Sequence, residues 1–208
     1  TGDAVIVLGG PAMLIGLGGG SASSTKKTND NADLDFASVQ RSNPEMQRRA
    51  QQVLDKFNER SSKNPITFIH DVGAGGISNA IPELAKDTNL GVEVNLENID
   101  SADQTMSPME LWCNESQERY VFTIPMKKLR ALEDICRKER CPFSIAGYLT
   151  EDKIIKIRFY EDEIVNLHLD DLFGEIPLPD LIAQNYDRST AREDLPLNDL
   201  QSLIFNVL

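Results

Sequence analysis

The sequence predicts an α+β fold in which helices pack on a β-sheet, and three observations lead to this prediction. Residues 66–83 run from four apolar or β-branched side chains through three glycines into a helical pattern, which is typical of a strand, a tight loop and a helix. Residues 44–60 repeat apolar side chains at helical spacing, as an amphipathic helix on a sheet does. Residues 91–96 alternate apolar and polar side chains, which indicates a half-buried strand.

The first part of the chain contains a strand and a clear helix start. Residues 1–8 predict the strand, and because the chain begins inside it we expect a fragment of a longer protein. Asn43, Pro44 and Glu45 supply an N-cap, a proline at the first helical position and an acid in the first turn. The helix over residues 44–60 is therefore expected to begin at this point.

The later part of the chain predicts further elements and a domain boundary. Ser107 and Glu110 form a capping box, so a short helix should follow Ser107. Residues 175–208 change pattern to a proline-broken linker and a final helix, which separates them from a lobe over residues 1–174. The remaining helices are predicted at residues 77–87 and 126–139, and the remaining strands at 120–124, 143–149, 153–160 and 164–169.

Composition and charge exclude several classes of function. The chain has 208 residues, of which 40% are hydrophobic and 26% charged, as in ordinary globular proteins. Its formal net charge of −12 argues against a general binder of nucleic acid or acidic membranes, because such proteins carry an excess of Lys and Arg. A phosphate ligand stays compatible with this charge, since glycine-rich backbone and one Mg²⁺ can hold it.

Hydropathy and cysteine usage indicate a cellular compartment. The sequence contains no apolar run long enough for a bilayer and no signal-peptide pattern at its N-terminus. Cys113, Cys136 and Cys141 form no CxxC pair and leave an odd thiol, which suits a reducing compartment. We therefore expect a cytoplasmic protein whose cysteines are buried small hydrophobic residues and not metal ligands or redox centres.

A candidate phosphate and metal site lies at the loop after Asp71. Gly75 and Gly76 stand directly before a predicted helix, whose N-terminus offers unpaired backbone N–H groups to a phosphate. Asp71 ends the preceding strand and could hold the counter-cation, because Mg²⁺ prefers carboxylate and phosphate oxygens. A surface connection is the alternative for the other candidate phosphate loop, Gly18, Gly19 and Gly20.

A second polar feature separates the short helix from the strand at residues 120–124. Residues 114–119 bring two carboxylates, a hydroxyl, two amides and a guanidinium together without an apolar side chain. A solvated turn is the usual explanation for such a run. The mixture of groups also suits recognition of a small polar ligand, so the sequence leaves both interpretations open.

Four motifs in this order resemble the family of phosphoribosylformylglycinamidine synthases, also called FGAM synthetases or FGAR amidotransferases, in their long single-chain form. They run through nearly the whole chain and read GGPAMLIGLGGG (9–20), DLDFASVQRSNPEM (33–46), HDVGAGGISNAIPE (70–83) and MELWCNESQER (109–119). The resemblance implies the C-terminal lobe of the first of two halves of the aminoimidazole ribonucleotide synthetase type. Such a lobe has an α+β fold with a mixed β-sheet and packed helices.

The resemblance also implies a reaction and roles for individual residues. The family is an ATP-dependent C–N ligase that makes FGAM from FGAR, ATP and glutamine in purine biosynthesis. Asp71 matches a Mg²⁺-binding aspartate, whereas neither His70 nor His168 matches the catalytic histidine, so no catalytic residue is expected in this chain. The residues that match contacts to the substrate are Gln40, Glu115, Ser116 and Gln117.

Partners follow from the same resemblance. It implies a preceding ATP-binding lobe, a second synthetase half and a glutaminase domain that supplies ammonia, with FGAR, ATP and Mg²⁺ bound by the intact enzyme. The isolated chain is then expected to be inactive, because its motifs form one wall of the site. Two alternatives stay open: a related ATP-dependent synthetase with another substrate, and a structural or interface lobe without its own ligand. Whether this half holds the productive or the auxiliary nucleotide site also stays open.

Overall fold

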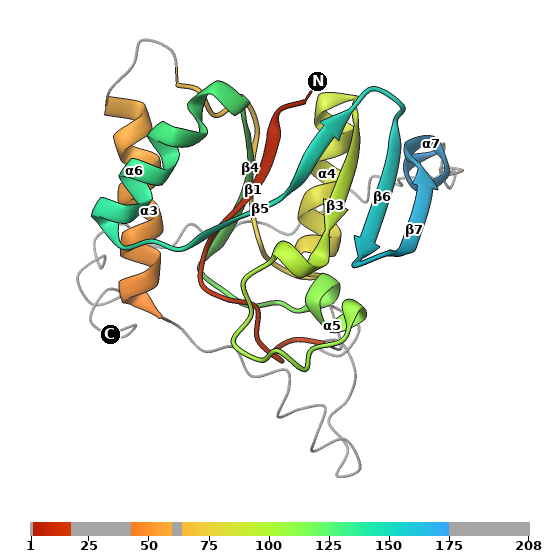
Figure 1. Ribbon diagram of the computed structural model, residues 1–208, viewed down its shortest axis with the longest axis horizontal. Helices are drawn as coiled ribbons and strands as arrows, with labels where there is room; N and C mark the ends of the chain where they lie inside the picture. The colour runs from red at the N-terminus through yellow and green to blue at the C-terminus, as the bar shows by residue number, and fades with distance from the viewer. Residues whose placement is uncertain (1, 18–42, 60–63, 175–208) are drawn as a thin grey trace, which may run out of the picture. The chain divides into compact units, whose positions relative to one another are not determined.

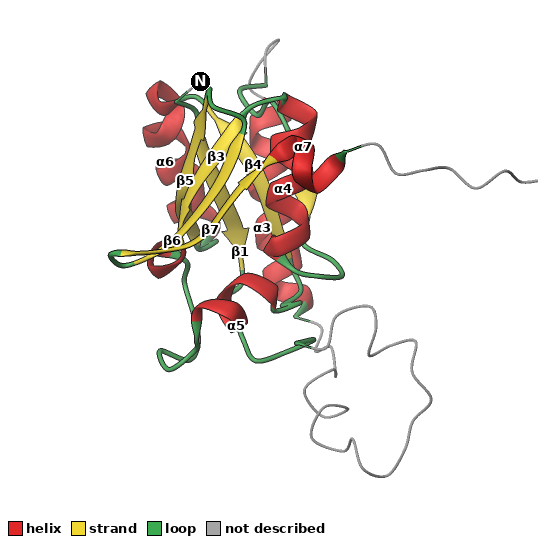
Figure 2. Cartoon of the chain, turned by 90° about the vertical axis from the view of Figure 1, so that its right-hand side faces the viewer, coloured by secondary structure: helices red, strands yellow, loops and turns green. Residues whose placement is uncertain are grey.

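The computed structural model describes residues 2–17, 43–59 and 64–174. These residues form a seven-stranded sheet with the strand order β2-β4-β1-β5-β3-β6-β7 and helices packed against it (Figures 1 and 2). The strands are β1 (Ala4–Gly9), β2 (Ile69–Asp71), β3 (Gly91–Asn95), β4 (Arg119–Ile124), β5 (Phe143–Thr150), β6 (Ile154–Phe159) and β7 (Asp162–His168). The helices are α3 (Pro44–Glu59), α4 (Ile77–Thr88), α5 (Pro108–Cys113), α6 (Leu129–Glu139) and α7 (Leu169–Phe173), with short 3-10 turns η2 (Leu96–Asn98) and η3 (Met126–Lys128).

The sheet is mixed, which confirms the predicted fold class. β3 and β6 run parallel, while the other pairs, including β1 with its neighbours β4 and β5, are antiparallel. Strands and helices alternate along the described residues from β1 to β5, but none of these helices connects two neighbouring parallel strands, because β3 and β6 are separated in sequence by β4 and β5. The described residues therefore lack the repeated βαβ units of an α/β fold, as expected of an α+β domain.

The central strand β1 is buried on both faces and divides the apolar side chains between two cores. Because side chains alternate along a strand, Ala4, Ile6 and Leu8 pack with α3 and α6, and Val5 and Val7 pack on the side of α4 and α5. Figure 1 shows α3 and α6 on one side of the sheet and α4 on the other. β1 is thus a two-sided core strand, which accounts for its uninterrupted apolar sequence.

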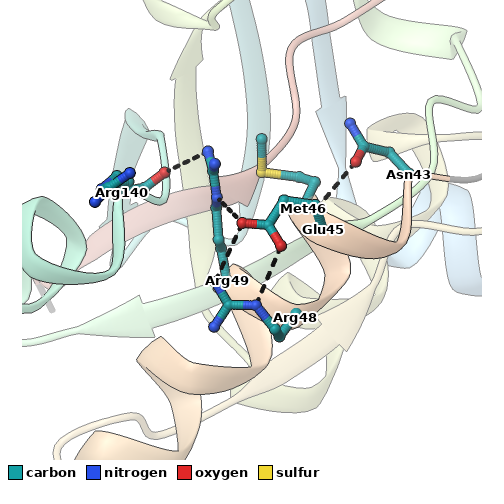
Figure 3. Close-up of polar contacts among 6 residues, drawn as sticks. All are labelled: Asn43, Glu45, Met46, Arg48, Arg49 and Arg140. Atoms are coloured by element: carbon teal, nitrogen blue, oxygen red, sulfur yellow. Dashed lines mark hydrogen bonds and ion pairs between the residues drawn. The ribbon is translucent and has the colours of Figure 1, made fainter.

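The start of α3 has the predicted cap and is tied to the end of α6 (Figure 3). The side-chain oxygen of Asn43 accepts a backbone N–H from the first turn at 3.1 Å. Glu45 binds Arg48 at 3.1 Å and Arg49 at 3.0 Å, and these hydrogen bonds lower the pKa of Glu45 to about 2. Arg49 also donates to the carbonyl oxygen of Arg140, which directly follows α6, at 3.2 Å.

Most predicted elements are present, with differences at their ends. The strand predicted from residue 66 is regular only over Ile69–Asp71, because Thr67 and Phe68 hydrogen-bond irregularly to Thr123 of β4. The helix predicted from residue 126 opens with the turn η3 before α6. Within the described parts of the chain, no helix is long and apolar enough to cross a membrane. The linker and helix predicted for residues 175–208 lie outside the described residues, so the domain division stays a prediction.

Candidate functional site

Three segments that are far apart in the sequence meet at one end of the sheet. They are residues 12–16 after β1, residues 72–76 between β2 and α4, and residues 114–118 between α5 and β4. Hydrogen bonds join them: the backbone N–H of Glu115 donates to the carbonyl of Ile15, the N–H of Gly75 donates to Oε1 of Glu115, and the N–H of Met13 donates to the hydroxyl of Ser116, all at 2.8 Å. α5 lies beyond this end of the sheet in both ribbon views (Figures 1 and 2).

The glycine loop packs directly on the backbone of the polar run. Gly75 has φ +79° and Gly76 has φ +65°, which are left-handed conformations that favour glycine. A Cβ atom on Gly76 would lie 2.0 Å from the carbonyl oxygen of Asn114, so no side chain fits there. Gly76 precedes the first residue of α4, as the strand, loop and helix pattern predicts.

Asp71 ends β2 with an exposed side chain, where an external ligand can reach it. Among the described residues, no three His, Cys, Asp or Glu side chains come together as a metal cage. Mg²⁺ commonly takes one or two carboxylates and completes its shell with phosphate oxygens and water. A single exposed carboxylate beside a glycine loop fits a Mg²⁺ ion of that kind, shared with a phosphate.

His70 is held by helix α4 and not by the polar run. Its Nε2 lies 3.1 Å from a carboxylate oxygen of Asp87, and its Nδ1 lies 3.7 Å from a carboxylate oxygen of Glu83. His168 ends β7, which is the edge strand on the opposite side of the sheet from β2, and its side chain caps α7. These positions fit the interpretation of both histidines as structural residues.

Glu115 holds the three segments together. Its side chain is only 8% exposed, and Oε1 accepts the N–H of Gly75. A Cβ atom on Gly16 would lie 2.5 Å from Oε2, so the carboxylate fills the space that the missing side chain of Gly16 leaves. The carboxylate is thus fixed between the two glycine-containing segments.

Ser116 is fully buried and contributes a second link. Its hydroxyl donates to Oδ1 of Asn114 at 2.6 Å and accepts the backbone N–H of Met13 at 2.8 Å. Gln117 differs from its neighbours, because it is half-buried and its amide nitrogen donates only to the carbonyl of Glu115, at 3.3 Å, within the described residues. Of the triplet, Gln117 therefore has the side chain that is most available to a ligand.

The structure gives roles to the first and last residues of the polar run, Asn114 and Arg119, to which the sequence assigned no individual role. Asn114 is fully buried, and its amide nitrogen donates to the carbonyls of Glu110 and Leu111 at the end of α5. Arg119 is 2% exposed, and burial lowers the pKa of Arg119 to about 10, an effect that the nearby carboxylate of Asp100 opposes. The burial of Arg119 could have been predicted from alternation along the strand, because residue 119 lies on the same strand face as the buried Val121.

The other predicted ligand contacts cannot be placed. Gln40 and the glycine run Gly18, Gly19 and Gly20 lie outside the described residues. In the described parts of the chain, Asp71, Gly75, Gly76 and the triplet are brought to one end of the sheet by the contacts given above. The glycine loop and the polar run are therefore neighbours in space, while their roles toward a ligand stay predictions.

Comparison with known proteins identifies the type of domain. Residues 1–159 match the family model described as "AIR synthase related protein, C-terminal domain". The fold is similar to Thermotoga maritima PurL complexed with FGAR (23% identity, TM-score 0.74, 89% of this chain and 30% of that chain). It is also similar to phosphoribosylformylglycinamidine synthase II of the same organism (21% identity, TM-score 0.70, 89% and 28%) and, more distantly, to a chain of a HypE–HypF complex (13% identity, TM-score 0.55, 80% and 53%). At these identities the structures show a shared fold, and this chain spans less than a third of the PurL chains.

Proposed function

This chain belongs to the family of AIR synthase related proteins, whose C-terminal domain it contains, and we propose that it is a lobe of a phosphoribosylformylglycinamidine synthase. The intact enzyme would convert FGAR, ATP and glutamine to FGAM in purine biosynthesis. The observation that carries this proposal is the hydrogen bond from Gly75 to Glu115. It joins the predicted metal loop to the predicted substrate triplet, as one composite site requires.

The fold likeness supports the proposal without establishing the substrate. The similar PurL structures include a complex with FGAR and a complex with ATP. Three of the four sequence motifs have described residues around one end of the sheet, namely residues 9–16, 70–83 and 109–119. The motifs and the geometry therefore point to the same surface.

Exposed and buried residues of the candidate site would have different roles. Asp71 would hold Mg²⁺, which neutralises phosphate charge when bound. Gln117, and Gln40 from the segment before α3, would orient the polar part of FGAR by amide hydrogen bonds. Glu115 and Ser116 hold the loops in register, since their side chains are already engaged with Gly75 and with the backbone N–H of Met13.

The proposal includes partners that this chain does not supply. A preceding lobe would bind ATP, a second synthetase half would complete the pseudo-symmetric enzyme, and a glutaminase would release ammonia from glutamine. The location of such an enzyme would be cytoplasmic. Because the described residues form only one wall of the site, the isolated chain should show no steady FGAM formation with FGAR, ATP, Mg²⁺ and ammonia.

The test uses the intact enzyme that contains this chain and two substitutions of side chains that do not belong to the core. Asp71→Asn should lower activity strongly and raise the Mg²⁺ concentration needed for half-maximal rate, because it removes a carboxylate ligand. Gln117→Ala should raise KM for FGAR. Both variants should unfold at nearly the wild-type urea concentration, because exposed or half-buried substitutions usually change stability by less than about 0.5 kcal/mol.

Asp162→Asn is the matched control, since Asp162 is an exposed carboxylate on the distant strand β7. It should leave the rate and the Mg²⁺ dependence unchanged. Full turnover of Asp71→Asn or Gln117→Ala would show that the assigned role of that residue is wrong. Full turnover of both would favour a structural lobe without its own ligand.

A further inference from the structure

Arg119 is a buried cation with an unusual set of contacts. It is the first residue of β4, pairs with Gly9 of β1, and is 2% exposed. Its Nη1 donates to Oδ1 of Asn114 at 3.2 Å, while Nε and Nη2 have no hydrogen-bond partner among the described residues. A buried guanidinium that satisfies so few of its donors is costly, so packing alone does not account for an arginine here.

The contact with Asn114 fixes the orientation of that side chain. Oδ1 of Asn114 also accepts the hydroxyl of Ser116 at 2.6 Å, while the amide nitrogen donates to two carbonyls at the end of α5. Turning the amide over would place its nitrogen against the guanidinium of Arg119 and lose all of these bonds. A charge-assisted donor is stronger than a neutral one, so Arg119 secures the orientation that the network needs.

The network continues from Asn114 into the segment after β1. The hydroxyl of Ser116 donates its proton to Asn114 and accepts the backbone N–H of Met13 at 2.8 Å with one of its lone pairs. Two residues later, the carbonyl of Ile15 accepts the N–H of Glu115, whose carboxylate accepts the N–H of Gly75. A continuous chain of hydrogen bonds and backbone thus runs from Arg119 to the glycine loop.

The charge of Arg119 is balanced from the same end of the sheet. The carboxylate of Asp100 lies near the guanidinium, and both residues border a narrow hollow together with Ser144. The backbone of Asp100 is held on both sides, since its N–H donates to the hydroxyl of Ser144 at 3.0 Å and its carbonyl accepts the N–H of Ala12 at 2.8 Å. The guanidinium of Arg119 therefore has Asn114 of the polar run as one neighbour and Asp100, which is bonded to the segment after β1 at Ala12, as another.

We propose that Arg119 is a positioning residue of the substrate site: through Asn114 and Ser116 its guanidinium sets the loop geometry in which Gln117 meets the ligand. The inference rests on the proposed function for the identity of that ligand. Arg119 itself is buried beneath the loop and does not touch substrate. Its removal should weaken binding through the loop and leave the sheet intact.

The test compares Arg119→Met with Arg119→Lys in the intact enzyme. Arg119→Met keeps an unbranched apolar stem, two atoms shorter than arginine, and removes the charge and every donor; it should raise KM for FGAR about tenfold or more while kcat per folded enzyme changes much less. Arg119→Lys keeps a charged donor and should recover part of the lost affinity. Arg158→Met is the control, because Arg158 is a half-exposed strand arginine paired with Glu93 and Glu163 on β3 and β7.

Amide hydrogen exchange gives a readout that does not depend on the substrate. Arg119→Met should speed exchange at Met13, Glu115 and Gly75 by at least about tenfold more than at the central strand β1, since local opening is separate from global unfolding. If Arg119→Met does not fold, Arg119→Lys should show the same local pattern in weaker form. Exchange that is unchanged, or raised equally over the whole sheet, would overturn the positioning role.

The two measurements also separate this inference from the proposed function. An intact enzyme that makes no FGAM, but whose Arg119 variants show the local exchange pattern, would refute the proposed substrate and keep the positioning role. An enzyme that makes FGAM with unaltered KM in Arg119→Met would keep the function and overturn the positioning role.

Discussion

Replacing Gly76 by alanine gives the sharpest test of the way the glycine loop is packed. Gly76 has φ +65° and ψ −148°, a conformation that only glycine adopts readily. The added Cβ atom would lie 2.0 Å from the carbonyl oxygen and 2.9 Å from the carbonyl carbon of Asn114. Both atoms belong to the backbone, so the loop and the polar run would have to separate.

The expected loss of stability follows from two terms. A non-glycine residue in this backbone region costs about 1–3 kcal/mol, and an overpacked buried contact typically costs about 1–3 kcal/mol more. Together they predict that Gly76→Ala lowers the free energy of unfolding by about 2–6 kcal/mol. That loss is a large part of the whole free energy of unfolding of an ordinary domain, which is about 5–15 kcal/mol.

Gly73→Ala is the matched control in the same loop. Gly73 does not have a positive φ, and its added Cβ atom would come no closer than 3.6 Å to Oδ2 of Asp71, an ordinary contact. Its urea midpoint should stay near the wild type, whereas the midpoint of Gly76→Ala should fall clearly with an unchanged m-value. Equal midpoints for the two variants would refute the close packing of the loop on Asn114, and with it the convergence of the candidate site.

Further predictions concern the cap of α5 and the cysteines. Ser107→Ala removes the capping box with Glu110 and should lower the free energy of unfolding by about 1 kcal/mol, measured by urea titration. A thiol reagent at pH 8 should label the half-buried Cys113 before Cys136 and Cys141, because burial raises the pKa of Cys136 to about 12 and of Cys141 to about 11. In the unfolded chain these thiols have a pKa near 9. The burial of the neutral thiols therefore contributes fully to the free energy of unfolding below pH 9, and this contribution should be lost as the pH rises toward 12. Immediate labelling of all three thiols, or stability that rises from pH 9 to 11, would contradict this expectation.

Local sequence signals predicted most of the secondary structure. The capping residues Asn43 and Ser107 mark helix starts that the structure places at Pro44 and Pro108. Alternation predicted β3, and runs of strand-forming residues predicted β5, β6 and β7. The strand order and the parallel β3–β6 pair depend on contacts between distant segments, which local patterns do not record.

The candidate site could be predicted as a set of loops but not as a network. The motifs identified Asp71, Gly76 and the triplet, because glycines and polar runs stand out in the sequence. The hydrogen bond from Gly75 to Glu115 spans 40 positions, and that from Met13 to Ser116 spans 103. No local rule links such positions, so the roles of Asn114 and Arg119 could be recognised only once the chain was folded.

The geometry of Glu115 limits how this residue can take part in binding. A buried carboxylate is tolerated when its oxygens are hydrogen-bonded, and Oε1 already accepts the N–H of Gly75. Oε2 fills the space beside Gly16, where a Cβ atom would lie 2.5 Å from it. A ligand that binds Oε2 would therefore have to move the segment around Gly16, but it could leave the bond from Gly75 in place. A ligand that binds Oε1 would have to displace Gly75 and so move the loop that begins at Asp71, which would couple substrate binding to the predicted metal site.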